Sequence, residues 1–214
     1  MTSIKKIIVF GATGGTGKQV VAQALRAGHH VTAIVRNPGA LTLRHERLEI
    51  IKGDALQPQT FEKTINGKDL VVSCLGIQKL EPTTIYSEGV SNIIKAMQTA
   101  DVHRMICLSA AAVIVPPESS SLMKFVVKNI LQRIFRHSYA DMLIMEKILR
   151  ESTLNWTVIR APRLTDSGHA GIYRTTINES LRNPSKISRT DLADYIVNHL
   201  ADERTFKALV EISY

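Results

Sequence analysis

Residues 10–19 read FGATGGTGKQ, and this glycine-rich stretch decides the fold. It lies between an apolar run, 6–10, and a segment with helical periodicity, 16–27. Two kinds of nucleotide-binding turn follow a strand and open a helix in this way. One is the P-loop, which holds a nucleoside triphosphate, and the other lies under the pyrophosphate of a dinucleotide.

The P-loop pattern fails at both of its anchor positions. The pattern G-x-x-x-x-G-K-[ST] requires a glycine where this chain has Ala12 and a hydroxyl side chain where it has Gln19. Without that hydroxyl the turn lacks its magnesium ligand, and no later strand ends in an evident acidic partner for the metal. The sequence therefore argues against an NTPase or a kinase.

The dinucleotide turn fits the same residues. Gly11 permits a tight turn, Gly14 lets the backbone approach a pyrophosphate, and Gly17 lets helix and strand pack closely. The free N–H groups at the helix start and the helix dipole then attract the phosphates. The expected phosphate-binding turn comprises Gly11, Thr13, Gly14, Gly15, Thr16 and Gly17.

The end of the second apolar run indicates which dinucleotide is bound. An NAD-binding turn has a carboxylate about 20 residues beyond the glycines, which holds the ribose 2′-hydroxyl. Here residues 33–38 read AIVRNP, with Arg36 and no acid. A guanidinium suits the 2′-phosphate of NADP, so we expect NADP(H) as the cofactor. The alternative is an exposed arginine at a strand end.

Two later strand ends add candidate cofactor contacts. Asp54 and Ala55 follow the run 48–52, and Asp54 can accept a hydrogen bond from an adenine amino group. Leu75 and Gly76 follow the next run, and their backbone can approach the cofactor. Each pair can also be a simple turn, but both lie at carboxyl ends of strands, where such folds bind ligands.

Short apolar runs alternate with helical patterns along the chain. The expected strands are nearly continuous Val, Ile and Leu runs, typical of strands buried on both faces, at 6–10, 30–36, 48–52, 70–75, 104–109, 156–160 and 208–212. The expected helices span 16–27, 58–65, 83–100 and 191–200, the last after the N-cap candidate Thr190. This succession predicts an α/β fold: a Rossmann doubly wound parallel sheet with helices on both faces.

Composition narrows the function. The 214 residues carry a net charge of +8, but the basic residues form no block and aromatic residues are only 5%, so we expect no nucleic-acid partner. No apolar run is long enough to span a bilayer. Cys74 and Cys107 lie in apolar segments without metal-ligand spacing, which predicts buried thiols in a reduced, cytoplasmic protein. We expect no metal site.

Residues 118–140 depart from the regular alternation. The apolar side chains Leu122, Phe125, Val126, Ile130, Ile134 and Phe135 are interleaved with Lys124, Lys128, Arg133 and Arg136. A basic amphipathic helix of this kind can cover its own sheet, dock on a partner subunit, cover a substrate mouth or lie on a membrane surface. We expect self-packing or a subunit or substrate role, and no membrane.

Several motifs in order carry a family resemblance. They are GATGGTG (11–17), VRNP (35–38), KGDA (52–55), SCLG (73–76), YSEGVSNIIKAM (86–97), CLSAAA (107–112), EKILRESTLNWTVIRAPRLTD (146–166) and ISRTDLADYIV (187–197). The chain resembles the atypical short-chain dehydrogenase/reductases of the NmrA-like, NAD(P)H-binding group, and is similar to biliverdin-IXβ reductase/flavin reductases. The resemblance covers essentially the whole length. It implies a single domain, 1–214, with a small substrate-side region formed by about 110–190.

The resemblance also implies where the cofactor lies. NADPH would run along the glycine turn, Arg36, Asp54-Ala55 and Leu75-Gly76. Ser109 would lie beside the nicotinamide as the candidate catalytic residue, although a strand-end serine that caps a loop is an equal alternative. Pro162, Arg163 and Leu164 would border the nicotinamide, and Arg163 can hold an anion or form a surface salt bridge.

Departures from the family pattern bear on the chemistry. None of Tyr86, Tyr139, Tyr173 and Tyr195 has a lysine four residues later, so the Tyr-x-x-x-Lys pair of ordinary alcohol dehydrogenation is missing. Met142 and Arg163 stand where the mammalian-type biliverdin/flavin enzymes have histidines. Glu146 can act as a weak acid, although a solvated glutamate on a helix face is the preferred interpretation.

The expected function is an NADPH-dependent oxidoreductase that delivers hydride to a flat conjugated acceptor, such as a flavin, a quinone or a biliverdin-like molecule. The protein would then contribute mainly orientation and exclusion of water. The alternative is an NADP(H)-binding redox sensor without turnover. Epimerisation of a nucleotide sugar ranks below both, because it also expects the tyrosine–lysine pair. The expected partner is a small-molecule substrate, and the expected assembly is a monomer or homodimer.

Overall fold

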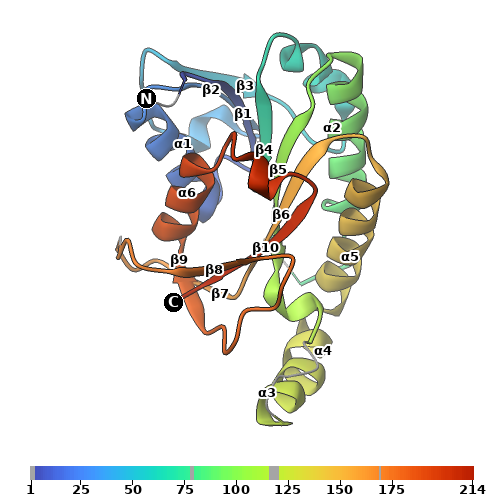
Figure 1. The fold of residues 1–214 in the computed structure, drawn as a ribbon. Helices are drawn as coiled ribbons and strands as arrows, with labels where there is room; N and C mark the ends of the chain where they lie inside the picture. The colour runs from blue at the N-terminus through green and yellow to red at the C-terminus, as the bar shows by residue number, and fades with distance from the viewer. Residues whose placement is uncertain (1–2, 78–79, 116–120, 169) are drawn as a thin grey trace.

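The computed structural model describes residues 3–77, 80–115, 121–168 and 170–214. Its centre is an eight-stranded sheet in the order β3-β2-β1-β4-β5-β6-β10-β8 (Figure 1). All neighbouring strands are parallel except β8, which is antiparallel to β10. The strands are β1 (Lys6–Phe10), β2 (His30–Val35), β3 (Leu48–Lys52), β4 (Leu70–Ser73), β5 (Arg104–Ala110), β6 (Asn155–Ala161), β8 (Arg174–Ile177) and β10 (Ala208–Ser213).

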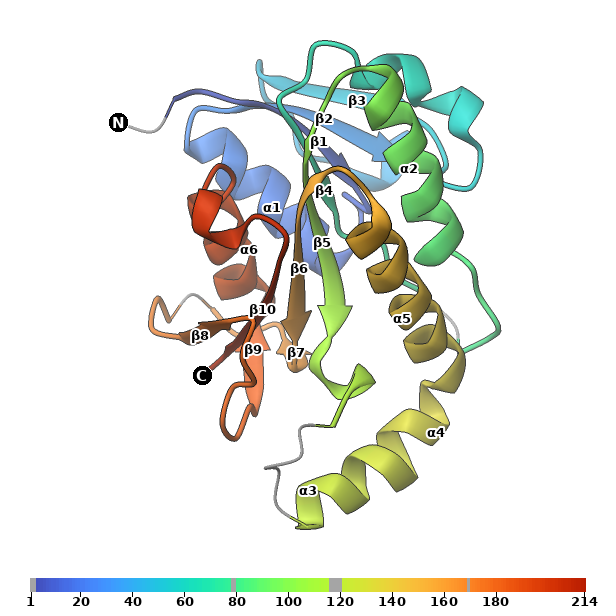
Figure 2. The same ribbon diagram turned by 45° about the vertical axis from the view of Figure 1, so that its right-hand side comes forward.

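Helices cover both faces of this sheet. Helices α1 (Gly15–Arg26) and α6 (Arg189–Asn198) pack on one face, and α2 (Ser87–Thr99) and α5 (Arg136–Glu151) pack on the other (Figure 2). Each pair closes its own apolar core against the buried strands. The predicted doubly wound Rossmann fold is confirmed. The strand order reverses between β1 and β4, and folds of this class bind ligands in the crevice at that point.

Helix α1 shows how the sequence pattern produces this arrangement. Its buried positions, Val20, Val21, Ala24 and Leu25, recur at helical spacing and lie against the sheet. The helix ends before Gly28, whose φ of 87° lies in the left-handed region that favours glycine. Because α1 starts directly after the turn that follows β1, its first N–H groups lie at the carboxyl edge of the sheet.

Two predicted helices differ in detail. The short helix expected at 58–65 is a pair of 3₁₀ turns, η2 (Pro58–Thr60) and η3 (Glu62–Ile65), because Phe61 leaves helical geometry to pack its ring edge-on against Phe10. Helix α6 starts earlier than expected. Its N-cap is Ser188, not Thr190, since the Ser188 side chain accepts a hydrogen bond from the backbone N–H of Asp191.

The remaining elements lie mostly beyond the carboxyl ends of the strands. β7 (Arg163–Thr165) and β9 (Lys186–Ser188) form a small parallel pair. The 118–140 segment, of which 118–120 lie outside the described residues, contains α3 (Ser121–Val126), the π-helical turn η5 (Val127–Leu131) and α4 (Gln132–Ile134). Three further 3₁₀ turns are η1 (Pro38–Ala40), η4 (Ala111–Val113) and η6 (Glu203–Thr205).

Candidate functional site: a cavity at the carboxyl ends of the strands

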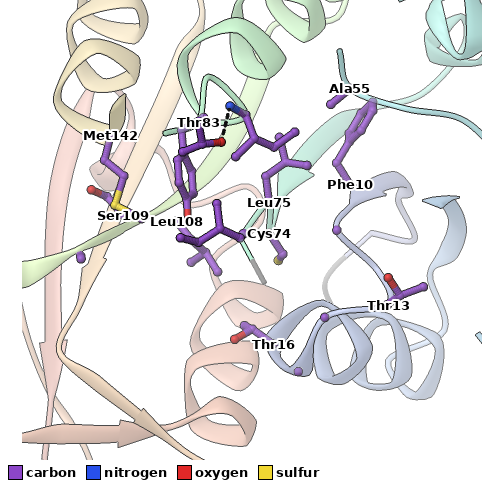
Figure 3. Close-up of a pocket in the computed structure, with 18 of the residues that line it drawn as sticks. Phe10, Thr13, Thr16, Ala55, Cys74, Leu75, Thr83, Leu108, Ser109 and Met142 are labelled. Carbon is purple, nitrogen blue, oxygen red and sulfur yellow. Dashed lines mark hydrogen bonds between the residues drawn. The ribbon is translucent and has the colours of Figure 1, made fainter. Parts of the chain in front are cut away.

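A cavity of about 670 Å³ runs along the carboxyl edge of the sheet. Its walls come from the ends of the consecutive parallel strands β1 to β6, the first turn of α1 and the start of α6. In Figure 3, Thr13 and Thr16 lie at the α1 side, whereas Ser109 and Met142 lie at the other end. The cavity therefore joins the predicted phosphate-binding turn to the predicted nicotinamide side.

The glycine turn is shaped by close backbone contacts. Gly11 has a φ of 71°, and a Cβ atom added there would lie 2.2 Å from the carbonyl oxygen of Cys74. A Cβ at Gly17 would lie 2.2 Å from the carbonyl oxygen of Gly11. Both positions therefore require glycine, as predicted for the turn and for close helix–strand packing. Gly17 itself is buried beneath the turn and does not line the cavity.

The amino end of α1 has the properties of an anion site. Its N-cap is Gly14, which carries no side chain to occupy the first N–H groups, and its first turn contains no acidic residue. Gly14, Gly15 and Thr16 line the cavity at this point. Backbone N–H groups and the positive end of the helix dipole thus face the space where a pyrophosphate would lie.

Arg189 is a site residue that the sequence analysis missed. It is the first residue of α6, and its side chain crosses Gly15 so closely that a Cβ there would lie 2.5 Å from Arg189 Cδ. Its Nη1 donates to Asp166 Oδ1 at 2.7 Å, and its side chain lines the cavity. Arg189 therefore brings a cation to the same turn from a distant part of the chain.

The opposite wall contains the predicted adenosine contacts. Arg36 is exposed at the end of β2 and lines the cavity, with Asp54 and Ala55 beside it at the end of β3. Asp54 Oδ1 accepts the backbone N–H of Leu56 at 3.0 Å, so one carboxylate oxygen serves a local turn. Arg36 thus presents an exposed cation to the cavity.

Leu75 and Gly76, which were predicted to approach the cofactor, also line the cavity. A Cβ atom added at Gly76 would meet nothing within 4 Å, so this glycine leaves open space beside the backbone. The backbone at Gly76 is thus accessible to a ligand.

The far end of the cavity is mostly apolar. Described residues that line it include Leu108, Ser109, Ala110, Met142, Ala161, Pro162 and Leu164. Arg163, by contrast, is exposed on β7 and is not among the described lining residues. The alternation of a strand explains this, because Pro162 and Leu164 face the cavity and the intervening side chain points to the opposite side.

Ser109 belongs to a buried charged network. Its Oγ donates to Glu146 Oε1 at 2.9 Å, and the same carboxylate accepts Arg160 Nε at 3.0 Å and Arg160 Nη2 at 2.6 Å. Arg150 Nη2 reaches the second carboxylate oxygen at 3.2 Å. The expectation that Glu146 is solvated is wrong: it is 1% exposed, because it balances the charge of Arg160 inside the protein.

Two tyrosines near this end do not resemble the phenol of an ordinary short-chain dehydrogenase. Tyr86 lines the cavity, and burial raises its pKa above the usual value. Burial also raises the pKa of Tyr139. In an ordinary dehydrogenase a neighbouring ammonium lowers the pKa of the phenol, and the described lining residues of this cavity include no lysine.

The amino end of α2, next to the cavity, is capped from another helix. Asp141, on α5, is 4% exposed and accepts the backbone N–H of Tyr86 at 2.9 Å and the hydroxyl of Ser87. This carboxylate supplies the capping interaction that α2 lacks locally, and so it fixes α5 against α2 beside the cavity.

The cysteines are buried, as predicted. Burial raises the pKa of Cys74 to about 12 and raises that of Cys107 as well, so both remain thiols. Within residues 3–77, 80–115, 121–168 and 170–214, no cluster of His, Cys, Asp and Glu is arranged to hold a metal ion. The described part of the chain also has no helix with the length and apolarity of a membrane span.

Sequence relatives match most of the chain at low identity. An uncharacterised chloroplastic protein of Arabidopsis thaliana is 26% identical over 219 residues, covering 97% of this chain and 76% of its own length. The photosystem II assembly factor Ycf39 of Synechocystis is 26% identical over 145 residues, covering 66% of this chain and 44% of its own length.

Solved structures share the fold over nearly the whole chain. They include a short-chain dehydrogenase/reductase from Veillonella parvula in complex with NADP (TM-score 0.80, 20% identity, 99% of this chain and 95% of that one). A putative NADH-flavin reductase from Streptococcus pneumoniae has a TM-score of 0.79 at 23% identity, covering 98% of this chain and 99% of that one. An anaerobilin reductase from Escherichia coli O157:H7 has a TM-score of 0.78 at 18% identity, covering 97% and 96%.

The family model described as NAD(P)H-binding matches residues 11–203, from the first glycine of the turn to the start of η6, just before β10. The glycine cradle and the uncapped amino end of α1 suit the pyrophosphate of this cofactor. The chain therefore belongs to the NAD(P)H-binding family.

Proposed function

We propose that this protein is an NADPH-dependent oxidoreductase whose acceptor is a flat conjugated molecule, such as a flavin, a quinone or a biliverdin-like pigment. The observation that carries the proposal is the composition of the cavity end beside Ser109. There the described walls are mostly apolar, with Leu108, Met142 and Leu164 around a single serine hydroxyl. Such walls accept a planar, apolar ring and provide no strong acid or base for an alcohol.

The family assignment and two structural neighbours support an oxidoreductase. The neighbours are a putative NADH-flavin reductase and an anaerobilin reductase, both of which are reductases of conjugated molecules by name. When bound, the nicotinamide cofactor supplies the hydride, and a conjugated acceptor can take its proton from solvent. This chemistry needs no Tyr-x-x-x-Lys pair, which the sequence lacks.

The chain's own residues would then bind and orient. The amino end of α1 and Arg189 hold the pyrophosphate, and Arg36 holds the 2′-phosphate that distinguishes NADPH from NADH. Ser109 donates its only hydrogen to Glu146, so toward the cavity its oxygen can only accept. Ser109 would therefore accept a hydrogen bond from the amide N–H of the nicotinamide or from an acceptor ring that carries an N–H group, and so fix its position.

Turnover on a panel of acceptors tests the proposal. Protein and NADPH are mixed with FMN, simple quinones and a biliverdin, and the loss of the near-ultraviolet absorbance of NADPH is followed. Catalytic turnover on any of them supports a reductase. Tight NADPH binding, measured by calorimetry, without turnover on any acceptor contradicts it.

A redox-sensing or regulatory role is the second candidate. It is supported by the missing Tyr-x-x-x-Lys pair and by the relative from Synechocystis, which is named as an assembly factor. NADPH would then shift the conformation or the partners of the protein without being consumed. The same calorimetric experiment separates the two candidates, because a sensor binds NADPH and returns it unchanged. A cytoplasmic location and a monomer or homodimer remain predictions.

A further inference from the structure

The segment formed by α3, η5 and α4 (residues 121–134) projects from the body of the protein. Both views show it beyond the carboxyl end of β5, on the side of α5 and away from α1 and α6 (Figures 1 and 2). Gln132 Nε2 donates to the carbonyl oxygen of Ala112 at 3.2 Å, which joins α4 to the turn η4 after β5. The segment is thus attached to the protein beside the apolar end of the cavity.

Large apolar side chains of this segment are exposed. Phe125 is 60% exposed, Ile130 44% and Ile134 49%. On the neighbouring helix α5, Leu143 is 38% exposed and Ile144 53%. Because these side chains are exposed, packing against the protein's own sheet does not account for them. Exposed apolar side chains that lie together are typical of a binding face.

The charges on the same surface are all positive. Between Glu118 and Asp141 the sequence contains four lysines and arginines and no acidic residue: Lys124, Lys128, Arg133 and Arg136. Lys128, Arg133 and Arg136 are exposed, and Lys124 is partly exposed. Isologous pairing of this face with a second copy would bring like charges together, so the surface is complementary to an anionic partner.

We propose that the face formed by residues 121–144 docks on an anionic lipid surface. Phenylalanine and isoleucine side chains beside lysines and arginines are what an interfacial helix uses, since the apolar groups enter the lipid and the cations meet the headgroups. Residues 121–134 are too few to cross a bilayer, so the segment would lie in the plane of the membrane surface.

The location of this face gives the docking a consequence. Gln132, on α4, donates to the carbonyl oxygen of Ala112, two residues after Ala110, which lines the apolar end of the cavity. Docking would bring this end of the cavity to the lipid, from which an apolar acceptor can enter. Docking itself does not depend on the proposed oxidoreductase activity and is tested without it.

Cosedimentation with lipid vesicles tests the inference. The full chain is mixed with vesicles of phosphatidylglycerol and phosphatidylcholine, or of phosphatidylcholine alone, and the bound fraction is measured at low and high salt. We expect binding to the anionic vesicles that weakens with salt, and far less binding to phosphatidylcholine alone.

Three paired substitutions locate the binding face. Phe125→Ser with Ile130→Ser removes apolar groups, and Lys128→Gln with Arg133→Gln removes charges. We expect each of these two pairs to weaken the affinity for anionic vesicles by about tenfold or more. Arg26→Gln with Lys63→Gln is the matched control, because it removes the same charge from exposed residues at the other end of the sheet. This control should bind like the wild type, and all variants should keep the wild-type melting temperature.

Several results would overturn the inference. One is the absence of binding to anionic vesicles, and another is binding that neither test pair reduces. An equal loss in the control pair would show charge attraction without a defined face. A wild-type dimer that Phe125→Ser with Ile130→Ser dissociates, seen by sedimentation equilibrium together with no vesicle binding, would show that a second copy covers this face.

Discussion

The Ser109 hydroxyl donates to the carboxylate of Glu146 across 2.9 Å, at the apolar end of the cavity. That carboxylate is held in turn by two hydrogen bonds from Arg160, both residues being buried. The serine hydrogen therefore points away from the cavity, and the side chain offers only an acceptor to a bound molecule. A strand-end serine is in this way fixed in one orientation.

Removing the Ser109 hydroxyl should slow the reduction of the substrate. Ser109→Ala should lower kcat/KM by about tenfold, since one hydrogen bond to the bound ring is lost, with little change in the melting temperature. Steady-state kinetics with the best acceptor of the panel measures it. A Ser109→Ala enzyme with wild-type kcat and KM would contradict the role.

Glu146 is a positioning residue in this scheme, and its role can be separated from stability. Glu146→Gln leaves the Arg160 charge buried without its partner and should destabilise the fold by about 3 kcal/mol. The double variant Glu146→Leu with Arg160→Met should recover much of that stability but not kcat, because Ser109 then lacks its acceptor. Recovery of both would mean that Glu146 is merely structural.

Arg36 should determine the choice of cofactor. Arg36→Ala should weaken NADPH binding by about 2 kcal/mol, roughly thirtyfold, because a charge-assisted contact to the 2′-phosphate is lost. NADH affinity should not change. Calorimetric titration of both cofactors measures the ratio, and Lys52→Ala, an exposed cation at the end of β3, is the control. An unchanged preference for NADPH in Arg36→Ala would exclude the role.

Arg189 should act on both cofactors alike. It lies over Gly15 at the pyrophosphate turn, and NADPH and NADH share the pyrophosphate. Arg189→Ala should therefore weaken both by about tenfold, whereas Arg189→Lys should keep part of the affinity. Stability should hardly change, because its partner Asp166 is exposed. The same titrations check this, and a selective loss of NADPH would contradict it.

The two arginines show what the sequence can and cannot predict. Arg36 follows an apolar run at a fixed distance from the glycines, so spacing along the chain places it at the cavity. Arg189 lies far from Gly15 in sequence, and only the packing of α6 beside α1 brings it over the turn. The motif ISRTDLADYIV contains Arg189 but gives no indication of which way the side chain points.

The burial of Glu146 and the short strands β7, β8 and β9 could not be predicted from the sequence pattern, for related reasons. On α5 the glutamate is followed by Lys147, as in an ordinary exposed pair, and Arg160 lies inside an apolar run, so neither pattern indicates a buried ion pair. Strands β7 and β9 are three residues each, and β8 is mostly exposed, so they lack the apolar periodicity that identified the central strands. The core strands were predictable because burial on both faces leaves a continuous apolar run.

Two glycines of the cavity should respond differently to alanine. Gly11→Ala should cost about 3 kcal/mol or more of folding free energy, because φ is 71° and the added Cβ would overlap the Cys74 carbonyl oxygen. Gly76→Ala should change stability by about 0.5 kcal/mol or less, since the new methyl meets open space. Urea unfolding measures both. Equal stability losses in the two variants would mean that the turn at Gly11 is not tightly packed against the Cys74 carbonyl.

Asp191 should give the fold an acid-dependent stability. It is fully buried at the first turn of α6 and accepts the backbone N–H groups of Ala170 and Gly171 and the hydroxyl of Tyr214. Burial alone would raise the pKa of this carboxyl, but the hydrogen bonds from Tyr214 and the two backbone groups hold it below the ordinary value of 3.8. The ionised form is therefore the one that the folded protein prefers.

The sign of the effect follows from that lowered pKa. Stability from Asp191 is complete above pH 3.8 and is lost as the pH falls through the lower folded value. Asp191→Asn should therefore be less stable than the wild type near neutral pH, and the difference should shrink in acid. Urea midpoints between about pH 3 and about pH 7 measure it, with the exposed Asp166→Asn as control. A difference that stays constant with pH would mean that the loss comes from packing and not from the charge.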